Sequence, residues 1–177
     1  MQKFLLFAVL TFVLASCSNV GKYKEAIESL SGDWDSTTNA VVAIGEKITT
    51  AQNSWNTMQE SMVVTDEMTE NLGEDVLGQI TELVAGNGAI SDQFGDLSKG
   101  VFEFVSNWEE KGKKLTELKE GLAGGKLPGD VQGTIDELTN LVSEGKTKVS
   151  GWEEGLASAQ AAAQSAMTKF KDLTNYQ

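Results

Sequence analysis

The sequence contains no histidine and no arginine, and it has only one cysteine and one proline. Without histidine, the Ser-His and Cys-His pairs of nucleophilic enzymes cannot form, and the usual ligands of zinc and iron sites are largely missing. A single cysteine also allows no disulfide within the chain. We therefore expect no catalytic residue, no metal site and no cofactor, and we interpret the protein as not being an enzyme.

Positive charge is also scarce compared with negative charge. All 14 basic residues are lysines, against 26 acidic residues, and the formal net charge is -12. Proteins that bind nucleic acids present basic patches, and they favour the bidentate arginine fork for phosphate. The composition therefore gives no reason to expect a nucleic-acid partner.

The first residues form a short leader. Lys3 supplies a positive start, residues 4–15 are an apolar run, and the leader segment closes with Leu14-Ala15-Ser16-Cys17. The run is too short for a transmembrane helix and is typical of a signal peptide. These features predict that the chain is exported.

Residues 14–17 resemble the lipobox of bacterial lipoproteins, in which an aliphatic residue and two small residues precede a cysteine. The resemblance covers only the leader. It implies that residues 1–16 are a signal peptide that is removed, that the Cys17 thiol carries lipid, and that the new amino terminus is acylated with chains such as palmitate. The alternative is a chance cysteine in an ordinary secretory signal.

The lipobox resemblance implies a lipid-anchored location on a membrane surface of the cell envelope. If the organism has two membranes, Ser18 is compatible with the outer membrane, facing the periplasm or the outside.

An apolar stripe organises the rest of the chain. Its members recur by alternating steps of four and three residues, and Gly145 is the one without an apolar side chain: Val131, Ile135, Leu138, Val142, Gly145, Val149, Trp152, Leu156, Ala159, Ala163, Ala166, Phe170 and Leu173. A period of 3.5 keeps one face of a helix on a coiled-coil seam.

The same spacing of apolar residues recurs in the earlier parts of the chain. It predicts helices over about 20–71, 75–122 and 130–174. Glycine signals separate them, at Gly73 and at the Gly124-Gly125 pair that precedes the only proline. The segment 86–88 looks like a loop, but the stripe passes through it in phase. We therefore expect one helix with a soft point there, although a break remains the alternative.

Short connections make neighbouring helices antiparallel. We therefore predict an all-α fold, with residues 17–177 forming a single helical-bundle domain. The domain is an elongated antiparallel three-helix bundle, up-down-up, with coiled-coil-like heptad packing. In this layout Trp55 and Phe94 lie level with Ala163, and large residues from two helices pack against small ones from the third.

The function that these features favour is structural, tethering or protein-interacting. We expect the membrane to be engaged through lipidated Cys17 and an envelope protein to be the partner, or else self-association. One alternative is a small-ligand or lipid-binding module that opens at glycine-rich points and has a hollow core around residues 86–100. Another is a coiled coil whose seam is completed by a second chain.

Overall fold

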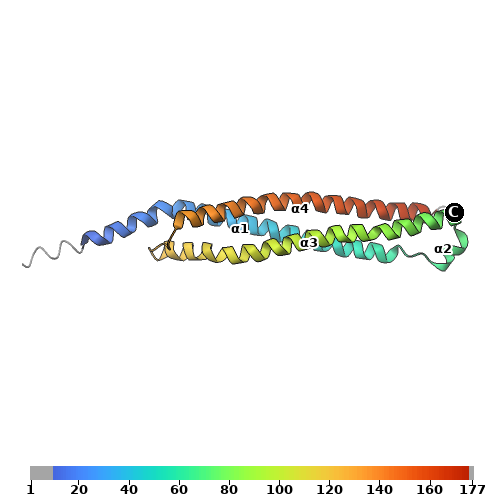
Figure 1. Ribbon diagram of the computed structural model, residues 1–177, viewed down its shortest axis with the longest axis horizontal. Helices are drawn as coiled ribbons and strands as arrows, with labels where there is room; N and C mark the ends of the chain where they lie inside the picture. The colour runs from blue at the N-terminus through green and yellow to red at the C-terminus, as the bar shows by residue number, and fades with distance from the viewer. Residues whose placement is uncertain (1–9, 176–177) are drawn as a thin grey trace, which may run out of the picture. The chain divides into compact units, whose positions relative to one another are not determined.

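The computed structural model describes the backbone of residues 10–175 and the side chains of residues 20–175. Within this stretch the regular structure is α-helical, without a strand, so the predicted all-α class is confirmed. The helices are α1 (Leu10–Ser61), α2 (Asp66–Asn71), α3 (Glu74–Ala123) and α4 (Val131–Thr174), as Figure 1 shows. The first nine residues of the predicted signal peptide and the Cys17 side chain lie outside the described residues.

The connection between α3 and α4 is where the sequence places it. Gly125 adopts a positive φ of 70°, and the amide of Lys126 donates to the Gly121 carbonyl at 2.9 Å, which closes the end of α3. The Asp130 carboxylate accepts a hydrogen bond from the Gly133 amide at 3.0 Å and caps the start of α4. Glycine and aspartate therefore set both ends of this turn.

The first predicted helix, 20–71, is wrong at its carboxyl end. The α1 helix stops at Ser61, residues 62–65 are not helical, and the short α2 follows. The Thr65 hydroxyl accepts a hydrogen bond from the Met68 amide at 3.2 Å and caps α2. Three consecutive β-branched residues, Val63 to Thr65, disfavour helix, and this local preference prevails although the apolar stripe stays in phase.

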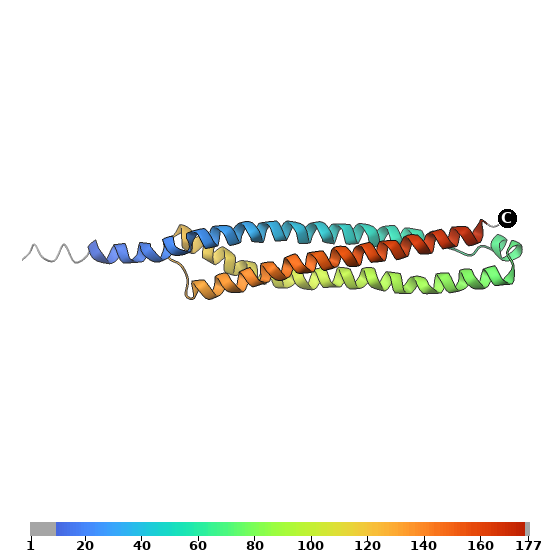
Figure 2. The same ribbon diagram turned by 90° about the horizontal axis from the view of Figure 1, so that it is seen from above.

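Two further features concern helix continuity. The α1 helix begins at Leu10 rather than near residue 20, since the apolar leader residues are themselves compatible with helix. The α3 helix runs unbroken through residues 86–88, and both views show it continuous (Figure 1, Figure 2). The glycine-rich segment therefore does not interrupt α3.

The described residues group into two compact units. Unit 1 comprises the chain up to Ala40 together with Phe104–Thr147, and unit 2 comprises Val41–Glu103 and the chain from Lys148 onward. The unit boundaries fall inside α1, α3 and α4 rather than in the connections. Each long helix therefore contributes to two cores.

The core of unit 1 is built around stacked tryptophans. The rings of Trp34 and Trp108 lie 3.7 Å apart between centroids and are inclined by 20°. The Trp108 indole donates a hydrogen bond to the Thr38 hydroxyl at 2.9 Å, which satisfies its polar group inside the core. Both tryptophans are buried, at 7% and 5% exposure.

Three short ion pairs hold the surface of unit 1. Glu137 of α4 accepts hydrogen bonds from Lys111 and Lys114 of α3 at 2.7 and 2.6 Å, and Lys146 pairs with Asp33 of α1 at 2.7 Å. The hydrogen bonds from Lys111 and then Lys114 lower the pKa of Glu137 from 4.5 to about 2. These pairs link helices that are distant in sequence.

In the core of unit 2, large side chains of α1 and α3 pack against a small side chain of α4, as the sequence predicts. Trp55, Phe94 and Ala163 belong to one buried cluster. The pairing of α1 with α3 is antiparallel within this unit. Gln52 accepts a hydrogen bond from Ser98, while Trp55, further along α1, donates one to Ser91, which comes earlier in α3.

Gly145 provides a test of the packing in unit 1. A Cβ added there would lie 2.7 Å from Cγ2 of buried Thr37 and 3.0 Å from Cζ of Phe104. We expect Gly145→Ala to lower the free energy of unfolding by about 1–3 kcal/mol, because the core cannot admit the methyl group without shifting. Chemical denaturation of the variant measures this loss.

Gly151→Ala is the matched control for Gly145→Ala, since Gly151 lies in the same helix and an added Cβ meets nothing within 4 Å. It should raise stability by up to about 1 kcal/mol, because alanine favours helix over glycine. Equal effects of the two substitutions would contradict the close contact at Gly145.

Glu137 predicts a pH dependence of stability. Because its pKa is lowered in the folded state, the ion pairs stabilise the fold above about pH 4.5, and their contribution disappears as the pH falls through about 2. We expect Glu137→Gln to lower the Tm at neutral pH, with the difference from the unaltered protein shrinking between these two values. Thermal unfolding over that pH range measures it. Glu117→Gln removes an exposed carboxylate of α3, and an identical pH profile for both variants would contradict the prediction.

Candidate functional site: an apolar groove and a lipid-attachment segment

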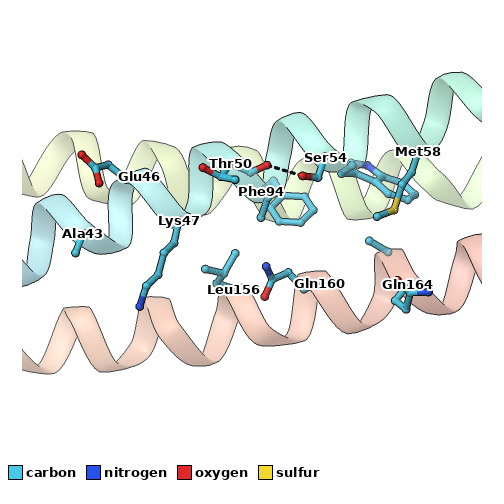
Figure 3. A pocket seen from close by; sticks show the side chains of 13 residues that line it. Ala43, Glu46, Lys47, Thr50, Ser54, Met58, Phe94, Leu156, Gln160 and Gln164 are labelled. Carbon is cyan, nitrogen blue, oxygen red and sulfur yellow. Dashed lines mark hydrogen bonds between the residues drawn. The ribbon is translucent and has the colours of Figure 1, made fainter.

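Unit 2 contains a groove with a cavity volume of about 710 Å³. Its walls come from α1 and α4, and α3 contributes Phe94 at the bottom (Figure 3). The volume lies within the usual range of small-molecule sites. It is therefore the strongest candidate for a binding site in this unit.

The floor of the groove is apolar. Five of its side chains are buried and Met58 is partly buried; the floor residues are Ala51, Trp55, Met58, Phe94, Leu156 and Ala163. The Trp55 indole N–H donates to the Ser91 hydroxyl at 3.0 Å. This bond fixes the ring and leaves the indole without a free donor toward the groove.

The rim of the groove is polar and exposed. It consists of Glu46, Lys47, Thr50, Ser54, Gln160 and Gln164. The Ser54 hydroxyl donates to the Thr50 carbonyl within α1 at 2.9 Å, the dashed line in Figure 3. Lys47 extends toward α4 and lies 3.9 Å from the Glu153 carboxylate, with both side chains more than half exposed. Charge is therefore concentrated at one end of the groove.

The groove results from small side chains between α1 and α4. Ala43 and Ala51 of α1 face the same space as Ala163 of α4. The sequence predicts that small residues at this level allow close packing. The residues are level as predicted and Ala163 is buried, yet the side between α1 and α4 stays hollow, because alanine is too short to fill it.

A second, smaller cavity of about 360 Å³ lies at the glycine-rich segment of α3, where Gly86 and Asn87 line it with Lys169 of α4. Asn87 is 4% exposed, and its amide donates to the Met62 sulfur at 3.5 Å. Its Oδ1 atom has no hydrogen-bond partner among the described residues. Both cavities border the segment 86–100, where the ligand-binding alternative predicts a hollow core.

Sequence reasoning identifies no residue of the groove as functional. The alanines at seam positions 51, 159 and 163 are a signal that could have indicated unfilled space. Among residues 20–175 no group of three or more acidic, histidine or cysteine side chains is placed to hold a metal ion. The predicted site residue, Cys17, has a helical backbone within α1, and its side chain is outside the described part of the chain.

Comparison with known proteins identifies the leader. Residues 1–18 match the family model of the prokaryotic membrane lipoprotein lipid attachment site. The match supports a bacterial lipoprotein, and it implies a membrane-anchored protein of the cell envelope. No curated protein and no solved structure matches the chain.

The helices themselves offer no membrane span. Over the described residues, none combines the length and the apolar character that crossing a bilayer requires.

Proposed function

We propose that this protein is held at the cell envelope by lipid on Cys17 and has a structural, tethering or protein-interaction role without catalysis. The observation that carries the proposal is the lipid-attachment match at residues 1–18, which includes the only cysteine of the chain. Each buried methylene contributes about 0.8 kcal/mol, so two or three acyl chains hold a protein on a membrane stably.

The fold that goes with this role is the up-down-up order of three long helices that the sequence predicts. Two observations support it. Within unit 2 the α1 and α3 contacts run antiparallel. Within unit 1 the paired residues of α3 and α4 also run in opposite senses along their helices from a short turn.

The interaction role is supported by the segment between α1 and α3. Val63 and Val64 are 57% and 39% exposed, and they are the two that are neighbours in the chain among the five exposed large apolar side chains of residues 20–175. The α2 helix that follows contains no buried residue. Met68 of α2 packs against the core of unit 2, whereas the two valines before the helix do not, and adjacent exposed apolar side chains are typical of a contact surface.

The anchoring is tested by replacing the cysteine. We expect Cys17→Ala to abolish incorporation of radiolabelled palmitate and to shift the protein out of the membrane fraction, because the acceptor thiol is lost. Ser18→Ala, the neighbouring substitution, should leave both unchanged. Retention of the label in Cys17→Ala would contradict lipidation at this residue.

The interaction role is tested by in-cell crosslinking of the lipidated protein, followed by purification from the membrane fraction. We expect an envelope protein to be crosslinked reproducibly and to be lost when Val63 and Val64 are changed to serine, since this removes the exposed apolar pair. Val84→Ser alters another exposed valine, at 38% exposure in α3, and should leave the partner in place.

The other outcomes of the crosslinking experiment are informative as well. Recovery of self-linked species alone would replace a separate partner by self-association. Recovery of uncrosslinked monomer alone would argue against an interaction role.

A second candidate function is binding of a small ligand or lipid. The apolar groove of unit 2, with Phe94 on its floor, is the specific observation that favours it. The two candidates are compatible, because the groove residues and the valine pair do not overlap.

A further inference from the structure

We propose that the groove of unit 2 binds an apolar organic cation, a small molecule with an apolar body and one positive charge. This ligand class narrows the small-ligand function proposed above and rests on it. Three features favour such a ligand: an apolar floor, a rim whose donors are already bonded, and the excess of negative charge in unit 2.

The floor of the groove accepts an apolar body. Trp55, Phe94 and Leu156 line it, and each is at most 6% exposed. The strong hydrogen-bond donor of the floor, the Trp55 indole N–H, already donates to the Ser91 hydroxyl at 3.0 Å. A polar body would lose its bonds to water here without replacement, whereas burial of an apolar body is favourable. The floor therefore takes the apolar part of a ligand and leaves its charge at the rim.

The donors of the rim are bonded within the protein. The Ser54 hydroxyl donates to the Thr50 carbonyl at 2.9 Å, and the Lys47 ammonium lies 3.9 Å from the Glu153 carboxylate. The other uncharged polar groups of the rim are a hydroxyl and two side-chain amides, which accept hydrogen bonds as well as donate them. An anion would therefore have to compete with Glu153 for Lys47.

A carboxylate of the rim is available to a cation. Glu46 lines the groove and is exposed, and it forms no ion pair within residues 20–175. Glu153 balances the charge of Lys47, so that this pair adds no net charge to the rim. The rim therefore keeps a net negative charge, which attracts a cation and repels an anion.

The charge of unit 2 acts in the same direction. Unit 2 contains fourteen acidic side chains against five lysines, whereas unit 1 contains twelve against nine. Residues 48–98 supply most of the α1 wall and the bottom of the groove, and none of them is basic. A hollow with apolar walls focuses the field of surrounding charges of one sign, and this raises the local concentration of ions of the opposite sign. The field of unit 2 therefore favours a cation in the groove.

The test uses the full chain, purified from the membrane fraction and incorporated in phosphatidylcholine vesicles. The probe is phenylbutyltrimethylammonium. Its matched controls are phenylbutanol and phenylbutanesulfonate, which carry the same apolar body with no charge or with a negative charge. Equilibrium dialysis measures the binding, and protein-free vesicles give the blank.

We expect the cation to bind saturably and about three- to tenfold more tightly than the alcohol, and the sulfonate to bind more weakly than either, as a surface potential of about one to two kT requires. The preference for the cation should shrink at about 1 M salt, where the Debye length is about 3 Å.

One pair of variants locates the site. Ser54→Phe should weaken binding of the cation by about tenfold or more, since its ring would occupy the groove from an exposed position where folding is not at risk. Ser158→Phe makes the same change at an exposed position of α4 that does not line the groove, and it should bind the cation like the unaltered protein.

A second pair of variants tests the charges of the rim. Glu46→Gln should weaken binding of the cation by about two- to threefold, because the unpaired carboxylate is lost. Lys47→Gln changes the neighbouring residue and should strengthen it by a similar factor, because the Glu153 carboxylate is then no longer balanced. Neither variant should change binding of the alcohol.

The outcomes distinguish the cationic ligand from the function on which it rests. Equal or tighter binding of the sulfonate, or equal effects of Glu46→Gln and Lys47→Gln, would overturn the cation and leave small-ligand binding in place. Binding of the cation that Ser54→Phe does not weaken would overturn the groove as the site. Failure of all three probes to bind saturably would overturn both the cationic ligand and the small-ligand function, without bearing on the anchored interaction role.

Discussion

The fold depends on one constraint, the burial of a single apolar stripe on each long helix. Helices of 44 to 52 residues that contain many glycines are poorly stable alone, because each internal glycine costs about 1 kcal/mol relative to alanine. Burial of side chains such as Trp34, Ile48 and Leu138 offsets this cost, and all three are at most 7% exposed. Elsewhere the stripe tolerates small residues, and the groove lies where it does so.

Two of the buried residues within 20–175 are polar, one in each unit. Thr37 in unit 1 and Asn87 in unit 2 are buried, and each has an oxygen without a hydrogen-bond partner among the described residues. Such atoms lower stability. We interpret them as register markers. The side chain of Thr37 fits against the bare backbone of Gly145, and Asn87 meets Met62, so a slip of either helix would place a larger or wholly apolar residue opposite.

The features that could be predicted from the sequence are those that depend only on residues close together in the chain. Gly125 and Asp130 close and open helices by their own backbone and side-chain bonds, so this turn could be predicted. The break after Ser61 could not, because the stripe continues through it in phase and only the β-branched residues oppose helix there. The lipobox is equally local. The groove could not be predicted in this way. Periodicity places Ala163 on the seam, but it does not set the distance from α4 to α1, on which the groove depends.

The two units differ in a way that bears on function. Unit 1 has its ion pairs between helices at 2.6–2.7 Å and a pair of stacked tryptophans. Unit 2 has an inter-helical ion pair at 3.9 Å, and it contains all five of the large apolar side chains that are exposed within residues 20–175. Regions that bind other molecules commonly have fewer stabilising contacts within the protein and more exposed apolar groups. The proposed interaction role therefore fits unit 2, which presents the exposed side chains, better than unit 1.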